Sequence, residues 1–205
     1  MIPLSIKIPF TLFMLVLVPV YWSIYGPLNF LYMCDLALFF TLAGLWLEKP
    51  LLFSMAGVGI IAPQLIWMFD FIMLLVTGKS FGMADYMAKE SIPLFVRIIS
   101  FYHFWLPIFL FFLIRKYGYQ KQALWAWTGF IWCVLILCYF ISPMPPADPA
   151  NPNAPVNVNY VFGPSSEHAQ TWMNPHVYIV SLMFSLFVLV YWPSNWVLNK
   201  LYGRT

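Results

Sequence analysis

The sequence predicts an all-α membrane protein, a bundle of about six transmembrane helices that forms a single domain over residues 1–205. Of the 205 residues, 62% are hydrophobic and only 8% are charged, whereas a soluble domain carries about 25% charged residues. The mean hydropathy is +0.81, and six stretches approach the roughly 20 apolar residues that a helix needs to cross the hydrocarbon core. The composition excludes a soluble enzyme, a nucleic-acid-binding module and a disordered regulator.

The six predicted spans follow one another with short turns at first and with longer connections later. The first span follows Lys7 and has no small-residue cleavage motif after it, so we expect it to be retained and not removed as a signal peptide. Gly26-Pro27 and Glu48-Lys49-Pro50 mark the turns after the first two spans. The predicted spans are residues 8–25, 28–47, 51–76, 92–114, 124–141 and 175–191.

Two longer connections lie on the side opposite the termini. Residues 77–91 are polar and mixed in charge, and residues 142–174 form a long loop that is rich in proline and asparagine. The proline spacing favours an extended, polyproline-like conformation for residues 142–155. Apolar and aromatic residues follow in 156–172, and we expect this second half to pack on the bundle.

The basic residues of the loops predict the orientation. Six spans place seven basic residues on one side and two on the other, and the basic side of a membrane protein faces the cytoplasm. Both termini are therefore expected in the cytoplasm, in a protein of the cell membrane. The two groups are Lys7, Lys49, Arg115, Lys116, Lys121, Lys200 and Arg204 on the inner side, and Lys79 and Lys89 on the outer side.

Four ionisable residues fall inside the predicted spans, at middle to outer depth. They are Asp35, Asp70, Arg97 and His103. Such groups are costly in a bilayer and commonly belong to functional sites. The alternative is structural: Arg97 pairs with Asp35 or Asp70 and so holds three helices together.

Cys34 and His103 are expected at similar depths on the second and fourth spans. A thiol beside an imidazole is the minimum apparatus for acyl transfer, because the imidazole generates the thiolate nucleophile. The alternative is that Cys34 packs as a small apolar side chain, as we expect for Cys133 and Cys138. No metal-ligand spacing, phosphate loop or dinucleotide fingerprint is present, so neither a metal nor a cofactor is expected.

Four segments together carry a family resemblance. Residues 28–37, 100–107, 157–162 and 172–178 place a cysteine in an early span, a histidine in a middle span and an Asn-Tyr pair before the last span. In this the chain resembles the bacterial YwaF-like integral membrane proteins. Through them it is distantly similar to polytopic lipid acyltransferases and to the androgen-induced membrane lipid hydrolases.

The resemblance implies site residues. Cys34 matches the nucleophile, His103 the base, and Asn159 and Tyr160 the Asn-Tyr pair. The chain departs from the family pattern in its proline-rich insertion before that pair and in Asp35, which directly follows the cysteine.

Three functions remain open at this point. The first is a membrane-embedded enzyme that transfers or hydrolyses the acyl group of a membrane lipid, with Arg97 holding a phosphate or an oxyanion. The second is a small transporter or lipid-binding protein in which Asp35, Asp70 and Arg97 line a polar path. The third is a non-catalytic accessory subunit of a membrane complex. Catalysis needs Cys34 and His103 in contact, whereas transport needs polar residues that continue to the cytoplasmic side.

The basic-residue bias makes the topology testable. In a variant without native cysteines, a cysteine at Lys121 should react with a membrane-impermeant maleimide only after the membrane is opened. A cysteine at Asn153 should react in intact cells. Labelling of the Asn153 position from the cytoplasmic side alone would contradict the predicted orientation.

Overall fold

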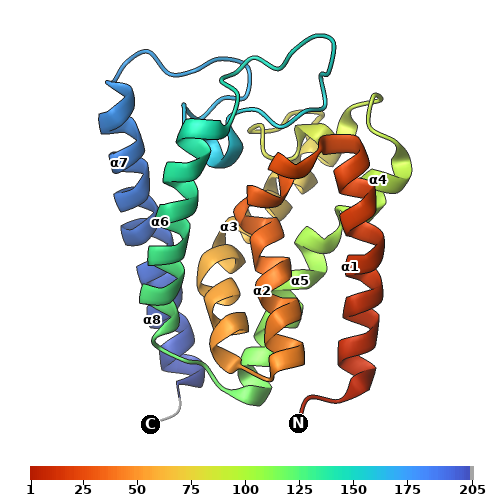
Figure 1. Ribbon diagram of the computed structural model, residues 1–205, viewed down its shortest axis with the longest axis vertical. Helices are drawn as coiled ribbons and strands as arrows, with labels where there is room; N and C mark the ends of the chain where they lie inside the picture. The colour runs from red at the N-terminus through yellow and green to blue at the C-terminus, as the bar shows by residue number, and fades with distance from the viewer. Residues whose placement is uncertain (204–205) are drawn as a thin grey trace.

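The computed structural model describes residues 1–203, and this part of the chain is helical, with turns and loops and no β-strand (Figure 1). The all-α prediction is confirmed for these residues. The helices are α1 (Leu4–Tyr25), η1 (Pro27–Leu31), α2 (Met33–Leu47), α3 (Pro50–Thr77), η2 (Asp85–Ala88), α4 (Leu94–Ile99), α5 (Tyr102–Tyr117), α6 (Ala123–Ile141), η3 (Val158–Tyr160), α7 (Pro175–Leu186), η4 (Phe187–Tyr191) and α8 (Trp192–Tyr202).

Five helical segments among the described residues are long and apolar enough to cross a membrane. The architecture therefore fits a multi-pass membrane protein. These segments are Leu4–Tyr25, Pro50–Thr77, Leu94–Tyr117, Ala123–Ile141 and Pro175–Tyr202.

The expected second span, residues 28–47, differs from the prediction. It forms the 3-10 helix η1 and then α2, which has only 15 residues. Tyr32 separates the two in an extended conformation, with φ −61° and ψ 138°. Apolar composition alone did not predict this break, because the break depends on hydrogen bonds from a distant loop, described below.

The fourth and sixth expected spans also differ in detail. A tight turn at Ser100 and Phe101 divides the fourth span into α4 and α5. The last helix continues beyond the expected end at residue 191, through a π-helical turn at Phe187–Tyr191 and on to Tyr202. Pro193 follows this turn and has no backbone N–H to donate, and a wide turn is one way for a helix to accommodate that loss.

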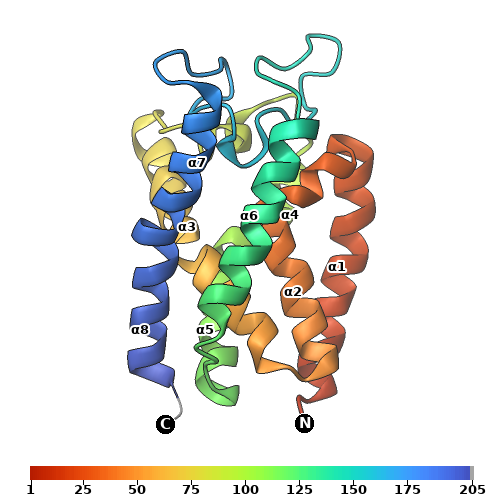
Figure 2. The same ribbon diagram turned by 60° about the vertical axis from the view of Figure 1, so that its left-hand side comes forward.

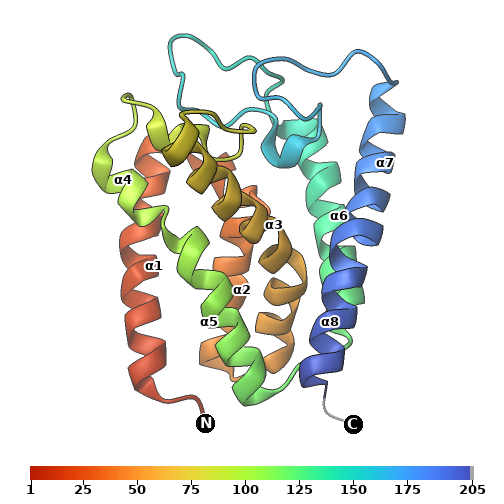
Figure 3. The ribbon, with the colours of Figure 1, turned by 180° about the vertical axis from the view of Figure 1, so that it is seen from behind.

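Helix α3 lies at the centre of the bundle and contacts α2, α5, α6 and α8. Figures 2 and 3 show the surrounding helices from two other sides. Small residues let neighbouring helices approach closely, and α3 carries a buried run of them at Ser54, Ala56, Gly57 and Gly59. The indole of Trp127, on α6, is fully buried against this run.

The two ends of the bundle have different characters. The start of α1, the end of α8 and the α2–α3 turn lie at one end, and the long loop lies at the other (Figure 1). At the first end Lys7 Nζ donates a 2.7 Å hydrogen bond to Glu48 Oε1, which holds the pKa of Glu48 below its ordinary value. This end is the one that the sequence predicts to be cytoplasmic. We call the opposite end, which carries the long loop, the outer end of the bundle.

The long loop has two parts. Residues 148–154 form consecutive turns instead of the expected extended segment, and Asp148 accepts a hydrogen bond from the backbone of Asn151. The later part packs on the bundle over residues 157–163, with Val158 and Val161 fully buried, whereas residues 164–172, which were also expected to pack, are mostly exposed.

The contact between α3 and α6 predicts a sharp difference between two glycines. A Cβ atom at Gly59 would lie 2.0 Å from Trp127 Cε2, whereas a Cβ at Gly129 would meet nothing within 4 Å. Gly59→Ala should therefore lower the free energy of unfolding by about 1–3 kcal/mol through overpacking, measured by denaturation in detergent micelles. Gly129→Ala is the matched control and should stay within about 1 kcal/mol of the parent. Equal losses in both variants would contradict the close packing of Trp127.

Candidate functional site

A buried carboxylate lies where two helices begin. Asp35 is in the first turn of α2, and its side chain is almost fully buried, at 2% exposure. It accepts hydrogen bonds from Asn29 Nδ2 at 2.8 Å and from the hydroxyl of Tyr102, the first residue of α5, at 3.1 Å. A helix N-terminus favours negative charge, and no ion pair within residues 1–203 includes Asp35.

The Cys34 thiol lies near the Tyr102 hydroxyl, but the hydrogen bond that this hydroxyl makes is the one to Asp35. Cys34 is partly exposed, whereas Tyr102 is buried. One phenol therefore bonds to the carboxylate that directly follows the candidate nucleophile in the sequence. We refer to Asn29, Cys34, Asp35 and Tyr102 as the outer polar cluster.

Two more polar side chains adjoin this cluster from α1 and from the α4–α5 turn. The hydroxyls of Tyr21 and Ser100 are 2.6 Å apart, and Ser100 also donates to the carbonyl of Val96. Ser100 therefore ties the break between α4 and α5 to α1. The break positions Tyr102, the first residue of α5, against α2.

His103 faces away from Cys34. Its Nδ1 lies 3.2 Å from Gln64 Nε2 on α3, and its ring stacks on Trp67 with centroids 4.6 Å apart. No hydrogen bond among the described residues joins His103 to Cys34. The reason is the helix period: consecutive residues point about 100° apart, so Tyr102 faces α2 and His103 faces α3.

Asp70 anchors the first outer connection. Its carboxylate accepts hydrogen bonds from the hydroxyl of Ser80 at 3.1 Å and from the backbone N–H of Ala84 at 2.9 Å. It also accepts from the backbone N–H of Phe81. With three donors on one buried carboxylate, Asp70 holds residues 80–84 against the outer end of α3.

The structural alternative, an ion pair between Arg97 and Asp35 or Asp70, is not formed in the described chain. Arg97 Nη1 donates to the backbone carbonyl of Met87 at 3.1 Å, and no ion pair in the described chain joins it to Asp35 or Asp70. Both carboxylates accept hydrogen bonds from neutral donors, and the guanidinium holds η2 in place through its bond to Met87.

Asn159 bridges the break between η1 and α2. Its Oδ1 accepts from the backbone N–H of Met33 at 3.1 Å, and its Nδ2 donates to the carbonyl of Leu31 at 2.8 Å. These are the backbone groups on either side of Tyr32, so the amide takes the place of a helical connection. Asn159 itself has φ +58°, a conformation that asparagine adopts more readily than most residues.

Tyr160 continues this docked segment beside the outer polar cluster. It also has a positive φ, of +63°. Burial raises the pKa of Tyr160, with a further contribution from Cys34, so the phenol stays neutral and available for hydrogen bonding. Of the seven predicted site residues, the structure thus brings Cys34, Asp35, Asn159 and Tyr160 into one region, and it leaves Asp70, Arg97 and His103 with other partners.

The interior changes character below the outer polar cluster. Leu38, Leu45, Leu106 and Leu110 are fully buried on α2 and α5 and provide no hydrogen-bonding side chain. Within the described residues no group of three or more His, Cys, Asp or Glu side chains could hold a metal ion. Single buried hydroxyls continue below the cluster, at Thr41 on α2, Ser54 on α3 and Thr128 on α6, whereas the outer polar cluster brings a carboxylate, a phenol and a thiol together.

Sequence reasoning missed Tyr102, Asn29 and Ser100. The available signal was polar side chains inside apolar stretches, at Asn29 and Ser100. Tyr102 immediately precedes His103, and the sequence does not reveal which of the two adjacent residues faces α2.

Comparison with protein-family models, with curated proteins and with solved structures finds no match to this chain. The class that the fold defines is a multi-pass helical membrane protein. The resemblance to YwaF-like proteins remains an expectation from the sequence.

The role of Asn159 is testable. Asn159→Ala removes both hydrogen bonds across the break in α2 and leaves two buried backbone groups unsatisfied, which should lower the free energy of unfolding by about 1–3 kcal/mol. The long loop should also become more sensitive to limited proteolysis. Asn151→Ala, at an exposed position of the same loop whose side chain makes no hydrogen bond within residues 1–203, is the control and should change neither measurement. Equal behaviour of the two variants would show that the loop is not docked through Asn159.

Proposed function

We propose that this protein is a membrane-embedded enzyme that acts on the acyl group of a membrane lipid through Cys34, with Asp35 and Tyr102 in the role first assigned to His103. The observation that carries the proposal is the 3.1 Å hydrogen bond from the Tyr102 hydroxyl to the buried carboxylate of Asp35, the residue directly after Cys34. A nucleophile connected to a base by a positioned hydrogen-bonding group is the arrangement that covalent catalysis requires.

The proposed reaction has two steps. In the first, the Cys34 thiol attacks the ester carbonyl, and its proton passes through the Tyr102 hydroxyl to Asp35. The tetrahedral intermediate then expels the lipid alcohol, which takes that proton from Asp35 by the same route, and a thioester remains on Cys34. In the second, water or an acceptor alcohol loses a proton to Asp35 as it attacks the thioester, and the proton returns to the released thiolate.

The position of the cluster favours a substrate from the outer leaflet. With cytoplasmic termini, as the basic residues predict, the cluster lies in the half of the membrane that faces outward. The fully apolar layer of Leu38, Leu106 and Leu110 argues against the alternative of a transport path through the bundle. Asn159 and Tyr160 would then belong to the lid over the site.

A second candidate is the non-catalytic accessory subunit. The observation that favours it is the use of Asp70, Arg97 and Asn159 to fix loops and a helix break. In this case the outer polar cluster would likewise serve to join helices, and the partner would be another membrane protein.

Thiol reactivity separates these functions. A long-chain alkyl maleimide should label Cys34 faster than Cys133 or Cys138, because only Cys34 has a base within reach. Tyr102→Phe removes the connecting hydroxyl and should slow Cys34 labelling about tenfold or more. His103→Gln is the matched control on the same helix and should have little effect. Thermal unfolding of each variant would establish that the fold is retained.

The other outcomes are equally informative. Slow labelling in His103→Gln with normal labelling in Tyr102→Phe would indicate that His103, and not Asp35, is the base. Equal labelling of all three cysteines in a folded protein would favour the accessory subunit.

A direct test is to look for an acyl adduct on Cys34 after incubation with a phospholipid. The adduct should appear as a mass increase that neutral hydroxylamine removes. It should be missing in Cys34→Ala.

A further inference from the structure

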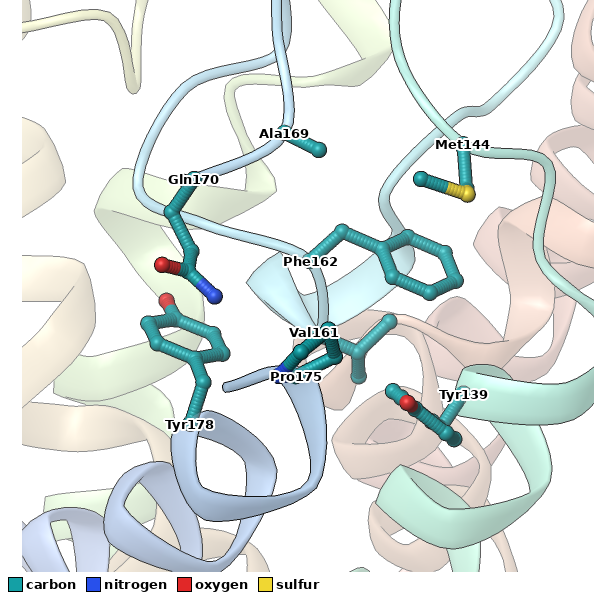
Figure 4. Close-up of a pocket in the computed structure, with 8 residues that line it drawn as sticks. All are labelled: Tyr139, Met144, Val161, Phe162, Ala169, Gln170, Pro175 and Tyr178. Atoms are coloured by element: carbon teal, nitrogen blue, oxygen red, sulfur yellow. The ribbon is translucent and has the colours of Figure 1, made fainter. Parts of the chain in front are cut away.

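A separate cavity of about 150 Å³ lies at the outer end of the bundle, between α6, α7 and the long loop (Figure 4). Tyr139 projects into it from α6, Tyr178 from α7, and Phe162 from the loop. The full lining is Tyr139, Met144, Val161, Phe162, Ala169, Gln170, Pro175 and Tyr178. None of these side chains carries a charge, so the cavity suits a neutral occupant.

Hydrogen bonds within the loop form the walls of this cavity. Phe162 donates its backbone N–H to Asn157 Oδ1 at 2.7 Å and accepts from the backbone N–H of Gln170 at 2.8 Å. Between them Gly163 has φ +148°, and a Cβ there would lie 2.8 Å from the Gln170 nitrogen. The loop is therefore built so that Phe162 and Gln170 face the same cavity, and pre-formed pockets of this kind are the usual ligand sites.

The polar groups of the cavity differ in their availability. The Gln170 amide is already bonded at both ends to the backbone of Met173, with each distance 2.8 Å. The Tyr139 hydroxyl lies 3.3 Å from His176 Nδ1. The Tyr178 hydroxyl has no hydrogen-bond partner within residues 1–203, and it points toward the Gln170 side of the cavity (Figure 4).

We propose that this cavity binds a small, neutral and mostly apolar group that carries one hydrogen-bonding atom, which Tyr178 recognises. A cavity of about 150 Å³ with apolar walls accommodates a molecule of benzene size. The aromatic walls favour a flat ring or a short chain. Such a group is either a free molecule, such as a simple phenol, or the end of a membrane lipid, and the two sources share this chemistry.

Binding of 4-fluorophenol tests the proposal. Fluorine NMR of the purified full-length protein in detergent should show saturable binding, and charged 4-fluorobenzoate should not bind. Tyr178→Phe should weaken 4-fluorophenol binding about two- to tenfold, by loss of one hydrogen bond. The same variant should leave the weaker binding of fluorobenzene unchanged, because fluorobenzene has no hydroxyl.

Two blocking variants establish the location. Ala169→Leu fills the cavity and should abolish binding, whereas Ala150→Leu adds the same atoms at an exposed position of the same loop and should not. If Ala169→Leu fails to fold, Met144→Trp at an exposed position of the wall provides a second block. Saturable binding that survives both blocks in folded protein would overturn the proposal, as would binding that never saturates.

Two further comparisons identify the source and separate this site from the proposed enzyme. If the occupant is the end of a lipid, phosphatidylcholine nanodiscs should weaken 4-fluorophenol binding relative to detergent. If it is a free molecule, binding should be equal in both. Cys34→Ala should leave 4-fluorophenol binding unchanged. The test of the cavity is therefore independent of the test of the proposed reaction at Cys34.

Discussion

The structure depends on one constraint: a backbone group inside an apolar bundle must find its hydrogen-bond partner within the protein. Unbroken helices satisfy this rule by themselves, but this chain interrupts two helices at outer depth, at Tyr32 and at Ser100. Asn159 supplies the missing partners at the first break. At the second, the Ser100 hydroxyl donates to the carbonyl of Val96, and the tight turn closes its own backbone hydrogen bonds. The outer half is consequently a polar joint held by side chains, whereas the inner half is mainly apolar, with single buried hydroxyls at Thr41, Ser54 and Thr128.

The two breaks also create the candidate site. Because α2 and α5 both begin at outer depth, their first turns place Cys34, Asp35 and Tyr102 side by side. A continuous helix through residue 32 would have used the Met33 N–H for its own hydrogen bond, and Asn159 would have had nothing to dock on. The same discontinuity therefore positions the thiol, the carboxylate and the loop that covers them.

Much of the fold was predictable from the sequence, because hydropathy and helix length are properties of single segments. The helical class, the first and third spans and the packing of residues 157–163 needed no knowledge of distant contacts. The site was less predictable, since it depends on which of two adjacent residues faces a given neighbour. His103 attracted attention as the only histidine in an expected span, yet Tyr102 contacts Asp35. An ion pair of Arg97 with Asp35 or Asp70 was one alternative, but Asp70 and Arg97 each bond mainly to loop backbone, and no pattern in the sequence specifies such partners.

The docking of Asn159 on Met33 has a consequence for the order of assembly. These two residues are 126 positions apart in the chain, so the ribosome finishes the first three helices long before it makes the asparagine. During that interval α1, α2 and α3 lie in the membrane without the two hydrogen bonds that Asn159 makes on either side of Tyr32. The native start of α2 is consequently a late event in biogenesis, completed only when the loop after α6 has been synthesised and has folded back onto the bundle.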